Sequence, residues 1–384
     1  MDNINLDLDF LNIKKFFLGA NTPFGFISYF DKPDKFDKHK QDWYRFLIKG
    51  GPGTGKSMLM KSIVNKLKDS SIDLEVIYCS SDPSSLDGVM INDKKNPKKI
   101  LILDATAPHV LEPVFPGAFE KTISICDCWC DKTLNKNKEK ITELFEENSF
   151  YQKQAVNLLL SSYGLLKNNF DIINKYLDKN ILDQYINNII NKELNLLEKQ
   201  NKLNNNTKGF EEKRFLSAVS TGDIIFYQNT IDIISKKTYV ISDQYGAVSN
   251  YLLSKIKNKL LDSNIDIITC YCCAFGGEKI DHILVPSLEV AFVTSNKYHD
   301  YNNYNNIFKL INQGDFLKNI NTSLESQLNF NQESIKDILK SATTFIKEAK
   351  IIHDKLEKIY SSAVNFNLVD QKTKETLELI EYIF

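Results

Sequence analysis

Eight consecutive residues, 50–57, combine four glycines with a lysine and a hydroxyl side chain. They match the pattern G-x-x-x-x-G-K-[ST] without a mismatch. Glycines let a backbone wrap closely around a phosphate, and the N–H groups of such a loop form a nest of donors for an anion. Lys56 would then reach the β- and γ-phosphates of a nucleotide, and the Ser57 hydroxyl would ligate Mg²⁺. The candidate nucleotide-binding residues are Gly50, Gly51, Pro52, Gly53, Thr54, Gly55, Lys56 and Ser57.

An acidic residue that would complete such a site is Asp104, which follows the apolar run at residues 100–103. Ligands of open α/β sheets bind at the carboxyl ends of the strands, so we expect Ser57 and Asp104 together to hold Mg²⁺. The next residue is Ala105, so the adjacent glutamate that many P-loop ATPases use as general base is absent. His109 is a candidate for phosphate contact, and a structural role beside a proline turn is its alternative.

A polar segment, residues 80–88, follows another expected strand at residues 74–79 and contains Asp82 and Asp87. A carboxylate in this position is able to position a water molecule or to accept a hydroxyl proton. Asp82 is our first candidate for this catalytic role beside Lys56, and Asp87 is the second. The alternative is an ordinary Asp-Pro turn followed by an Asp-Gly turn.

These residues need a strand before the loop and a helix after it. Residues 45–48 form the expected strand, and the apolar side chains of Met58, Leu59, Ile63 and Leu67 recur at helical spacing. Strands that alternate with helices in this way predict an α/β fold in which a mostly parallel sheet is flanked by helices.

A second copy of this arrangement follows in the chain. Residues 65–74 (NKLKDSSIDL) recur as residues 258–267 (NKLLDSNIDI), and both segments run into a strand that ends in Tyr-Cys. Further matches occur in the same order, and one of them aligns His109 with His299. The matches indicate a tandem duplication.

The second copy has lost the residues that bind a nucleotide. Residues 241–250 occupy the place of the phosphate loop, with Ser249 expected where Lys56 stands. Asp243 puts a negative charge where a phosphate would bind, and Thr294 aligns with Asp104. We therefore expect a degenerate second half with a structural or regulatory role.

Apolar residues at helical spacing also predict helices over residues 150–197 and 334–384, which we expect to form a helical hairpin appendage in each half. The predicted fold class is α/β with two tandem P-loop NTPase-like domains. The expected divisions are 1–130 for the P-loop domain with an intact Walker A loop, 131–199 for its helical appendage, 200–212 for a linker, 213–318 for the degenerate P-loop-like domain and 319–384 for the C-terminal helical appendage.

The composition excludes several classes of protein. Of the 384 residues, 42% are hydrophobic and 11% are aromatic, which rules out a disordered or fibrous chain. A formal net charge of −1 argues against nucleic-acid binding through the overall field. The apolar runs are too short to span a bilayer, and the acidic residues 1–10 lack a signal-peptide pattern. The 7 cysteines are too few for a disulfide scaffold, so we expect a cytoplasmic, reduced protein. Together with the charge and the apolar runs, this predicts no membrane partner and no clear nucleic-acid binding.

Several segments together resemble a family of duplicated P-loop ATP-binding proteins from spore-forming, low-GC Gram-positive bacteria. They are residues 18–26 (LGANTPFGF), 49–57, 79–88 (CSSDPSSLDG), 104–109 (DATAPH) and the C-terminal 352–360 (IHDKLEKIY). The resemblance covers nearly the whole chain and implies ATP as the ligand. Members of that family carry a phosphate loop in both halves, and this chain departs from them at Ser249 and Thr294.

The sequence as a whole predicts a Mg-dependent ATP-binding protein, a slow ATPase whose nucleotide site lies in the N-terminal half only. No arginine finger is evident, because Arg45 and Arg214 are the only arginines and both fall at the starts of elements. One alternative is a nucleotide-dependent switch that binds a protein partner through the helical appendages. Another is a phosphotransferase that acts on a small molecule, with the segment 80–88 lining the acceptor pocket.

Overall fold

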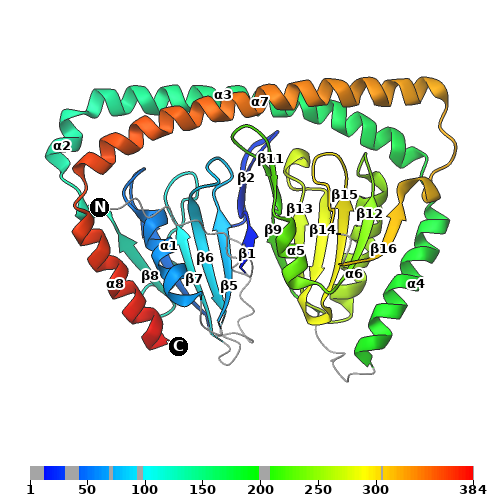
Figure 1. Cartoon of the computed structure of the whole chain (residues 1–384), viewed down its shortest axis with the longest axis horizontal. Coiled ribbons are helices and arrows are strands. Elements are labelled where there is room, and N and C mark those ends of the chain that lie inside the picture. Colours follow the sequence, from blue (N-terminus) through cyan, green and yellow to red (C-terminus); the bar gives the residue numbers. More distant parts are fainter. Residues whose placement is uncertain are drawn as a thin grey trace. The chain divides into compact units, whose positions relative to one another are not determined.

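The structure is a computed structural model that describes residues 13–30, 43–68, 72–92, 98–198, 208–303 and 306–383, without the side chains of 194–198 (Figure 1). Two six-stranded mixed sheets, mostly parallel and flanked by helices, form its α/β core, which confirms the predicted fold class. Within these described ranges, no helix has a stretch long and apolar enough to cross a lipid bilayer.

The first sheet has the strand order β1-β5-β6-β7-β4-β8. Its strands are β1 (Lys14–Phe16), β4 (Trp43–Lys49), β5 (Asp73–Tyr78), β6 (Leu86–Asn92), β7 (Lys99–Asp104) and β8 (Glu120–Ser124). Helix α1 (Lys56–Leu67) follows β4 and buries an apolar stripe that includes Leu59, Ile63 and Leu67. The predicted strand–loop–helix is therefore present, and its helix is amphipathic as the sequence pattern requires.

The second sheet repeats this topology with the order β9-β13-β14-β15-β12-β16, read from the equivalent edge. Its strands are β9 (Glu211–Arg214), β12 (Lys237–Ser242), β13 (Ile267–Tyr271), β14 (Ile280–Val285), β15 (Val290–Ser295) and β16 (Ile307–Asn312). Helix α6 (Ala247–Asp262) follows β12 as α1 follows β4, and the short α5 (Gln228–Ile234) precedes β12. The shared strand order is the arrangement that a tandem duplication predicts.

Smaller features also recur in both halves. The Tyr29 N–H donates to the Leu18 carbonyl at 2.7 Å, and the Tyr227 N–H donates to the Leu216 carbonyl at 3.0 Å. Two-stranded hairpins lie between these partners, β2 (Gly19–Thr22) with β3 (Gly25–Ser28) and β10 (Ser217–Val219) with β11 (Ile224–Phe226). Local hydrogen bonds thus support the alignment of the two copies.

Strand β6 in the first sheet and β14 in the second are each antiparallel to both neighbours, and each has a β-bulge near its start. Asp87 is the residue skipped where β6 pairs with β5, and Asp281 is the residue skipped where β14 pairs with β13. Because these two strands run in the direction opposite to their neighbours, their first residues lie at the edge of the sheet where the neighbouring strands end. The bulge then re-aims the aspartate side chain there.

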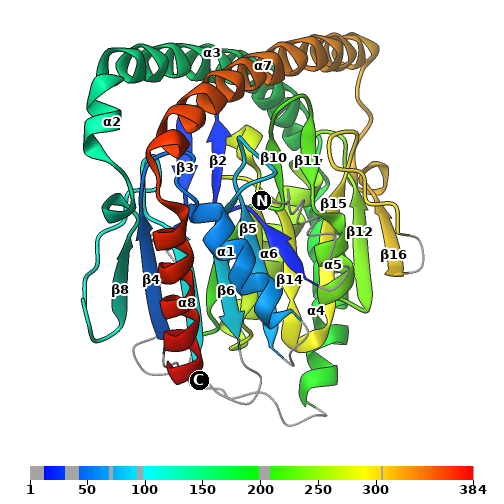
Figure 2. The same cartoon turned by 60° about the vertical axis from the view of Figure 1, so that its left-hand side comes forward.

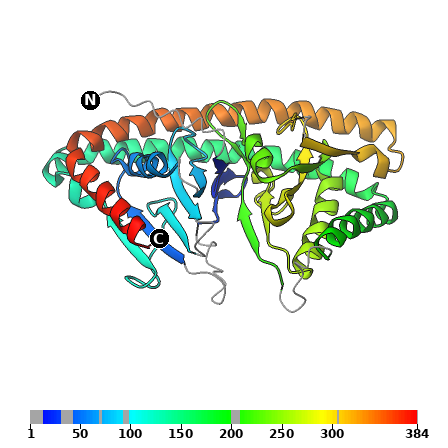
Figure 3. The ribbon, with the colours of Figure 1, turned by 60° about the horizontal axis from the view of Figure 1, so that its bottom comes forward.

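The helices outside the sheets are α2 (Asp131–Lys136), α3 (Lys138–Lys175), α4 (Lys179–Glu198), α7 (Thr322–Ala363) and α8 (Phe366–Ile383). Short 3₁₀ turns are η1 (Cys126–Cys128), η2 (Cys273–Phe275), η3 (Pro286–Leu288) and η5 (Gln313–Phe316). Helices α3 and α7 pair side by side (Figure 3), with Asn148 donating to the Ala349 carbonyl at 2.6 Å. Helix α8 lies beside α1 (Figures 1 and 2).

The chain divides into two compact units that are each assembled from separate segments. The first unit comprises Met1–Gly19, Ser28–Gln154 and Thr344–Phe384, and the second comprises Ala20–Ile27 and Ala155–Thr343. The C-terminal half of α7 and all of α8 therefore belong to the unit that contains the phosphate loop. The domain boundaries expected from the sequence stay a prediction.

Candidate functional site

The phosphate loop connects β4 to α1 and has the backbone conformation that its glycines permit. Gly53 and Gly55 adopt left-handed conformations, with φ of 63° and 98°, and Gly55 is the N-terminal cap residue of α1. Residues with a Cβ adopt such φ values only at a cost. The Thr54 hydroxyl donates to the Gly51 carbonyl at 2.8 Å and closes the loop on itself. Because Gly55 caps α1, the N-terminus of the helix lies at the end of the loop, and a helix N-terminus in this position favours a bound anion.

Lys56 folds back over this loop. Its Nζ donates to the carbonyls of Gly50 and Gly51 at 2.9 and 2.7 Å and lies 3.6 Å from Asp104 Oδ2. The Lys56 side chain is only 12% exposed, so its charge is held at the loop and not in solvent. The ammonium group is thus placed among the loop atoms, beside the acidic residue expected to share the site.

Asp104 ends β7, whose last residue pairs with Ile48 of β4 directly before the loop. Burial raises the pKa of Asp104, and the nearby Asp87 charge adds to this effect while Lys56 opposes it. The Thr106 N–H donates to Asp104 Oδ1 at 2.9 Å and fixes its orientation. A buried carboxylate of this kind is stabilised in its charged form when a cation binds beside it.

Ser57, the second metal ligand expected from the sequence, lies in the first turn of α1. Its Oγ accepts a hydrogen bond from the Leu86 N–H at 2.9 Å, at the start of β6. This bond ties the helix to the strand that carries Asp87. The structure therefore brings Lys56, Asp87 and Asp104 to one edge of the first sheet.

Asp87 forms a buried pair with His109. The Nε2 atom of His109 lies 3.1 Å from Asp87 Oδ2, and the two residues are 6% and 7% exposed. The His109 ring packs against Phe30 with the ring centroids 4.3 Å apart. Asp87, the second catalytic candidate from the sequence, lies at the start of the antiparallel strand β6, and its catalytic role stays a prediction.

Asp82 is turned toward its own segment instead. Its Oδ1 accepts hydrogen bonds from the Ser84 N–H at 3.1 Å and the Ser84 hydroxyl at 2.7 Å, and Oδ2 accepts from the Ser85 hydroxyl at 3.0 Å. Lys350 of α7 also lies 3.3 Å from Oδ2. Burial alone would raise the pKa of Asp82, but the Ser84 hydrogen bonds and the Lys350 charge outweigh it and lower the pKa. These contacts are those of a turn-closing aspartate.

Helices α7 and α8 pack directly against the glycines of the loop. A Cβ added to Gly51 would come within 2.7 Å of the Tyr360 ring, and one added to Gly53 within 2.6 Å of the Glu357 carbonyl oxygen. A Cβ on Gly55 would lie 3.1 Å from Val369. These helices follow the loop by about 300 residues in the chain, and no local pattern in the sequence points to the contact.

The second half keeps the cap glycine but not the loop. Gly246, with φ of 79°, caps α6 as Gly55 caps α1, so Ala247 stands at the position of Lys56. The expected placement of Ser249 at that position is therefore wrong. Between the end of the preceding strand and the cap glycine, the loop of the second half is two residues shorter than that of the first. An alignment without a gap cannot detect this difference.

Asp243 fills the space inside this shorter loop. Its carboxylate accepts hydrogen bonds from the backbone N–H groups of Tyr245, Gly246 and Ser249 at 3.2, 2.9 and 2.7 Å. Asp243 is fully buried. Backbone donors that would face a phosphate in the first half are thus occupied by a side chain here.

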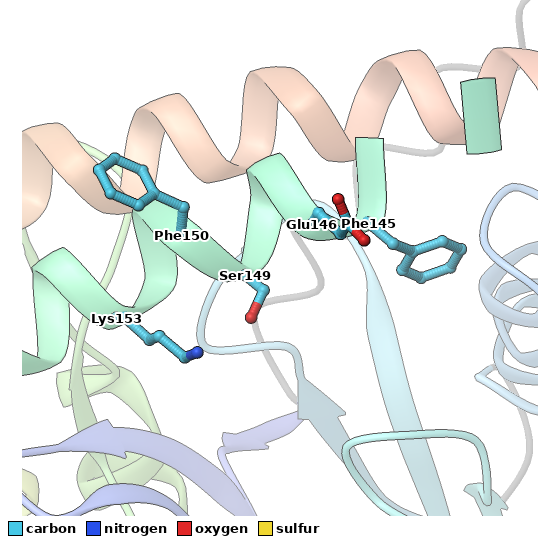
Figure 4. A pocket seen from close by; sticks show the side chains of 5 residues that line it. All are labelled: Phe145, Glu146, Ser149, Phe150 and Lys153. Atoms are coloured by element: carbon cyan, nitrogen blue, oxygen red, sulfur yellow. The ribbon is translucent and has the colours of Figure 1, made fainter. Parts of the chain in front are cut away.

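One shallow hollow lies along an exposed face of α3 (Figure 4). Figure 4 shows that its lining side chains come from this helix alone: Phe145, Glu146, Ser149, Phe150 and Lys153. None of them belongs to the predicted site. The hollow is therefore not a candidate for the nucleotide site.

The comparisons with known proteins find one match. Residues 31–90 match the family model described as Nephrocystin 3, N-terminal. This is a region found in NTPase-associated proteins, and the matched residues include the phosphate loop and α1. No curated protein and no solved structure matches the chain.

Proposed function

We propose that the first unit binds Mg-ATP at the phosphate loop and hydrolyses it slowly. The observation that carries this proposal is the position of Lys56, whose ammonium group lies on two loop carbonyls and 3.6 Å from Asp104. A lysine held there is able to move onto the phosphate oxygens with little displacement of the backbone. The match to a region of NTPase-associated proteins supports the same assignment.

The residues fit a magnesium nucleotide in their chemistry. The loop amides and Lys56 would stabilise the charge that develops on the γ-phosphate. Ser57 and Asp104 supply the hydroxyl and carboxylate oxygens that Mg²⁺ prefers. Bound Mg²⁺ would neutralise charge on the β- and γ-phosphate oxygens.

We assign the positioning of the attacking water to Asp87. Its carboxylate lies at the sheet edge where the carboxylate of Asp104 also lies, and His109 holds it in place from 3.1 Å. A hydrogen-bonded and oriented carboxylate is suited to orient a water or accept its proton. Asp82, the first candidate from the sequence, has its oxygens engaged by Ser84, Ser85 and Lys350.

We expect slow turnover because both arginines of the chain are engaged in ion pairs and neither is offered to stabilise the transition state. Arg45 is buried and paired with Glu120, and Arg214 is paired with Glu212. An arginine that stabilises the transition state typically raises kcat by ~10³–10⁵-fold, and both arginines of this chain are already engaged in these ion pairs.

A nucleotide-dependent switch is the second candidate, and the contact of α7 and α8 with the loop favours it. A phosphate that changes the loop conformation would act on Tyr360, Glu357 and Val369 directly. Under this alternative, hydrolysis only resets the contact between the loop and the helices. No comparable observation favours a phosphotransferase.

The test is release of phosphate by the purified full chain with ATP and Mg²⁺. Lys56→Ala should abolish the release, whereas Lys66→Ala, an exposed lysine on the same helix, should leave it unchanged. ATP binding without release would favour the switch. Equal release by the wild type and Lys56→Ala would refute the assignment of this site.

A further inference from the structure

A second group of polar side chains is buried in the second unit, away from the phosphate loop. Asp281, His282 and His299 are 1%, 1% and 6% exposed. One potential ligand atom from each residue lies within 4.8 Å of the other two. Two imidazoles and a carboxylate are a donor set that proteins use for divalent metals, and small side-chain movements would bring these three onto one ion.

The fold explains why two neighbouring residues of one strand point to the same place. Side chains of successive strand residues normally face opposite sides of the sheet. The bulge in β14 lies between Ile280 and His282, with Asp281 as the extra residue, and a bulge re-aims side chains in this way. The segment after β15 brings His299 to the same position.

Several atoms of the group have no hydrogen-bond partner within the described part of the chain. They are Asp281 Oδ2 and both ring nitrogens of His282. Buried polar side-chain atoms in proteins nearly always have a partner, so a further partner is expected for these atoms. Phe226 stacks on the His282 ring with the centroids 5.5 Å apart and excludes water from that face.

His299 is oriented as a metal-ligating histidine would be. Its Nδ1 lies 3.1 Å from the Thr294 carbonyl, so Nδ1 carries the proton and donates to that oxygen. The lone pair is then on Nε2, which lies 3.7 Å from Asp281 Oδ2 and accepts a hydrogen bond from the Asn296 side-chain amide at 3.3 Å, a bond that a metal would replace. Ligating histidines typically donate their other N–H to a backbone carbonyl in this manner.

We propose that Asp281 Oδ2, a ring nitrogen of His282 and Nε2 of His299 bind a divalent transition-metal ion of the zinc class. Three protein ligands leave a fourth position of the tetrahedron for water or a further donor. The site is specific to the second half, because Gly88 occupies the position equivalent to His282 in the first. The metal would replace the nucleotide as the bound cofactor of the degenerate half.

Lys279 limits the affinity of this site. Its ammonium group forms a buried ion pair with Oδ1 of Asp281, leaving only Oδ2 for the metal. A positive charge near a bound cation is unfavourable in a buried environment. We therefore expect Lys279→Met, which removes the charge but keeps most of the length of the side chain, to tighten binding.

The experiment measures binding of Zn²⁺ to the metal-free full chain and the absorption spectrum of its Co²⁺ form. The wild type should take up one ion that His282→Leu loses, with Kd raised at least about tenfold. The matched control is His353→Gln, which removes a histidine from a half-buried cluster on α7 with Asp354 and Glu357. This control should retain the ion.

A second variant keeps the proposal testable if His282→Leu fails to fold. Lys279→Met should lower the Kd for Zn²⁺ about tenfold, and its Co²⁺ form should show the intense visible bands of a tetrahedral site. No uptake of Zn²⁺, retention of the ion by a folded His282→Leu, or an unchanged Kd in Lys279→Met would each overturn the proposal. In those cases the unpartnered atoms are served by buried water only.

Discussion

Gly53 of the phosphate loop lies against the backbone of Glu357 in α7, so closely that a Cβ at Gly53 would meet the Glu357 carbonyl oxygen at 2.6 Å. The glycine thus satisfies two demands, a left-handed φ and space for a helix. Because the loop glycines serve as a packing surface, the conformation of the loop is coupled to α7 and α8.

Gly53→Ala should destabilise the first unit. The substitution combines strain at φ of 63° with a clash against backbone atoms, and we expect a loss of roughly 1–3 kcal/mol. Both tryptophans, Trp43 and Trp129, lie in this unit, so their fluorescence during urea denaturation reports its unfolding. Gly117→Ala is the matched control, because Gly117 has φ of 80° but no atom within 4 Å of its added Cβ. Equal losses in the two variants would show that the helix contact contributes nothing.

Asp87→Asn should reduce phosphate release about 100-fold or more while the Kd for ATP changes little, because a water-positioning carboxylate acts on the chemical step. Asp82→Asn provides the comparison, since Asp82 is engaged with Ser84, Ser85 and Lys350. It should lower stability and leave the rate within a few-fold of the wild type. The reverse pattern of rates would return the catalytic role to Asp82.

ATP should change the hydrogen exchange of the backbone amides in α8 and the C-terminal half of α7. The physical reason is the contact of Tyr360 and Val369 with the loop glycines, which a bound phosphate would reposition. Mass spectrometry of peptides from 344–383, with and without Mg-ATP, gives the measurement. Lys56→Ala should show no ATP-dependent difference. An identical exchange pattern in the wild type with and without a saturating nucleotide would exclude the switch.

Glu120→Gln should cost about 3–5 kcal/mol at neutral pH, because it removes the carboxylate that pairs with the buried Arg45 guanidinium. Burial would raise the pKa of Glu120, but the Phe115 N–H and Arg45 outweigh it and lower the pKa. A depressed pKa means that this stabilisation is present above pH ~4.3, the ordinary value for glutamate, and is lost as the pH falls through the folded-state value.

The urea midpoints of the wild type and Glu120→Gln should therefore converge in acid. The control is Glu143→Gln, whose carboxylate is 65% exposed in a pair with Lys140. It should change the stability by less than about 1 kcal/mol. A gap between wild type and Glu120→Gln that persists below pH ~3 would contradict the pairing of Glu120 with Arg45.

The sequence predicts those parts of the site that depend on neighbours in the chain. The strand, loop and helix around Lys56 follow from local pattern, and Asp104 falls at the last residue of β7, as expected. The proposed role of Asp87 depends on an antiparallel strand between parallel ones, which hydrophobic runs do not distinguish. The alignment expected for the second-half loop differs by two residues from that in the structure. Gly246, which caps α6 as Gly55 caps α1, was the signal in the sequence for the correct alignment.

Long-range contacts were beyond any pattern in the sequence. Tyr360 and Glu357 meet a loop about 300 residues earlier, and a helical stripe predicts only that a helix packs, not what it packs against. The group of Asp281, His282 and His299 had a partial signal, since two of the chain's 5 histidines lie in the domain 213–318, which was expected to lack nucleotide chemistry.

The measurement that tests the central claim most directly is a calorimetric titration of the full chain with ATP in the presence of Mg²⁺. One site in the first unit and a side-chain-filled loop in the second predict one ATP per chain. Lys56→Ala should abolish the binding heat, and Lys66→Ala should retain it. Two ATP molecules per chain, or undiminished binding by Lys56→Ala, would contradict the account.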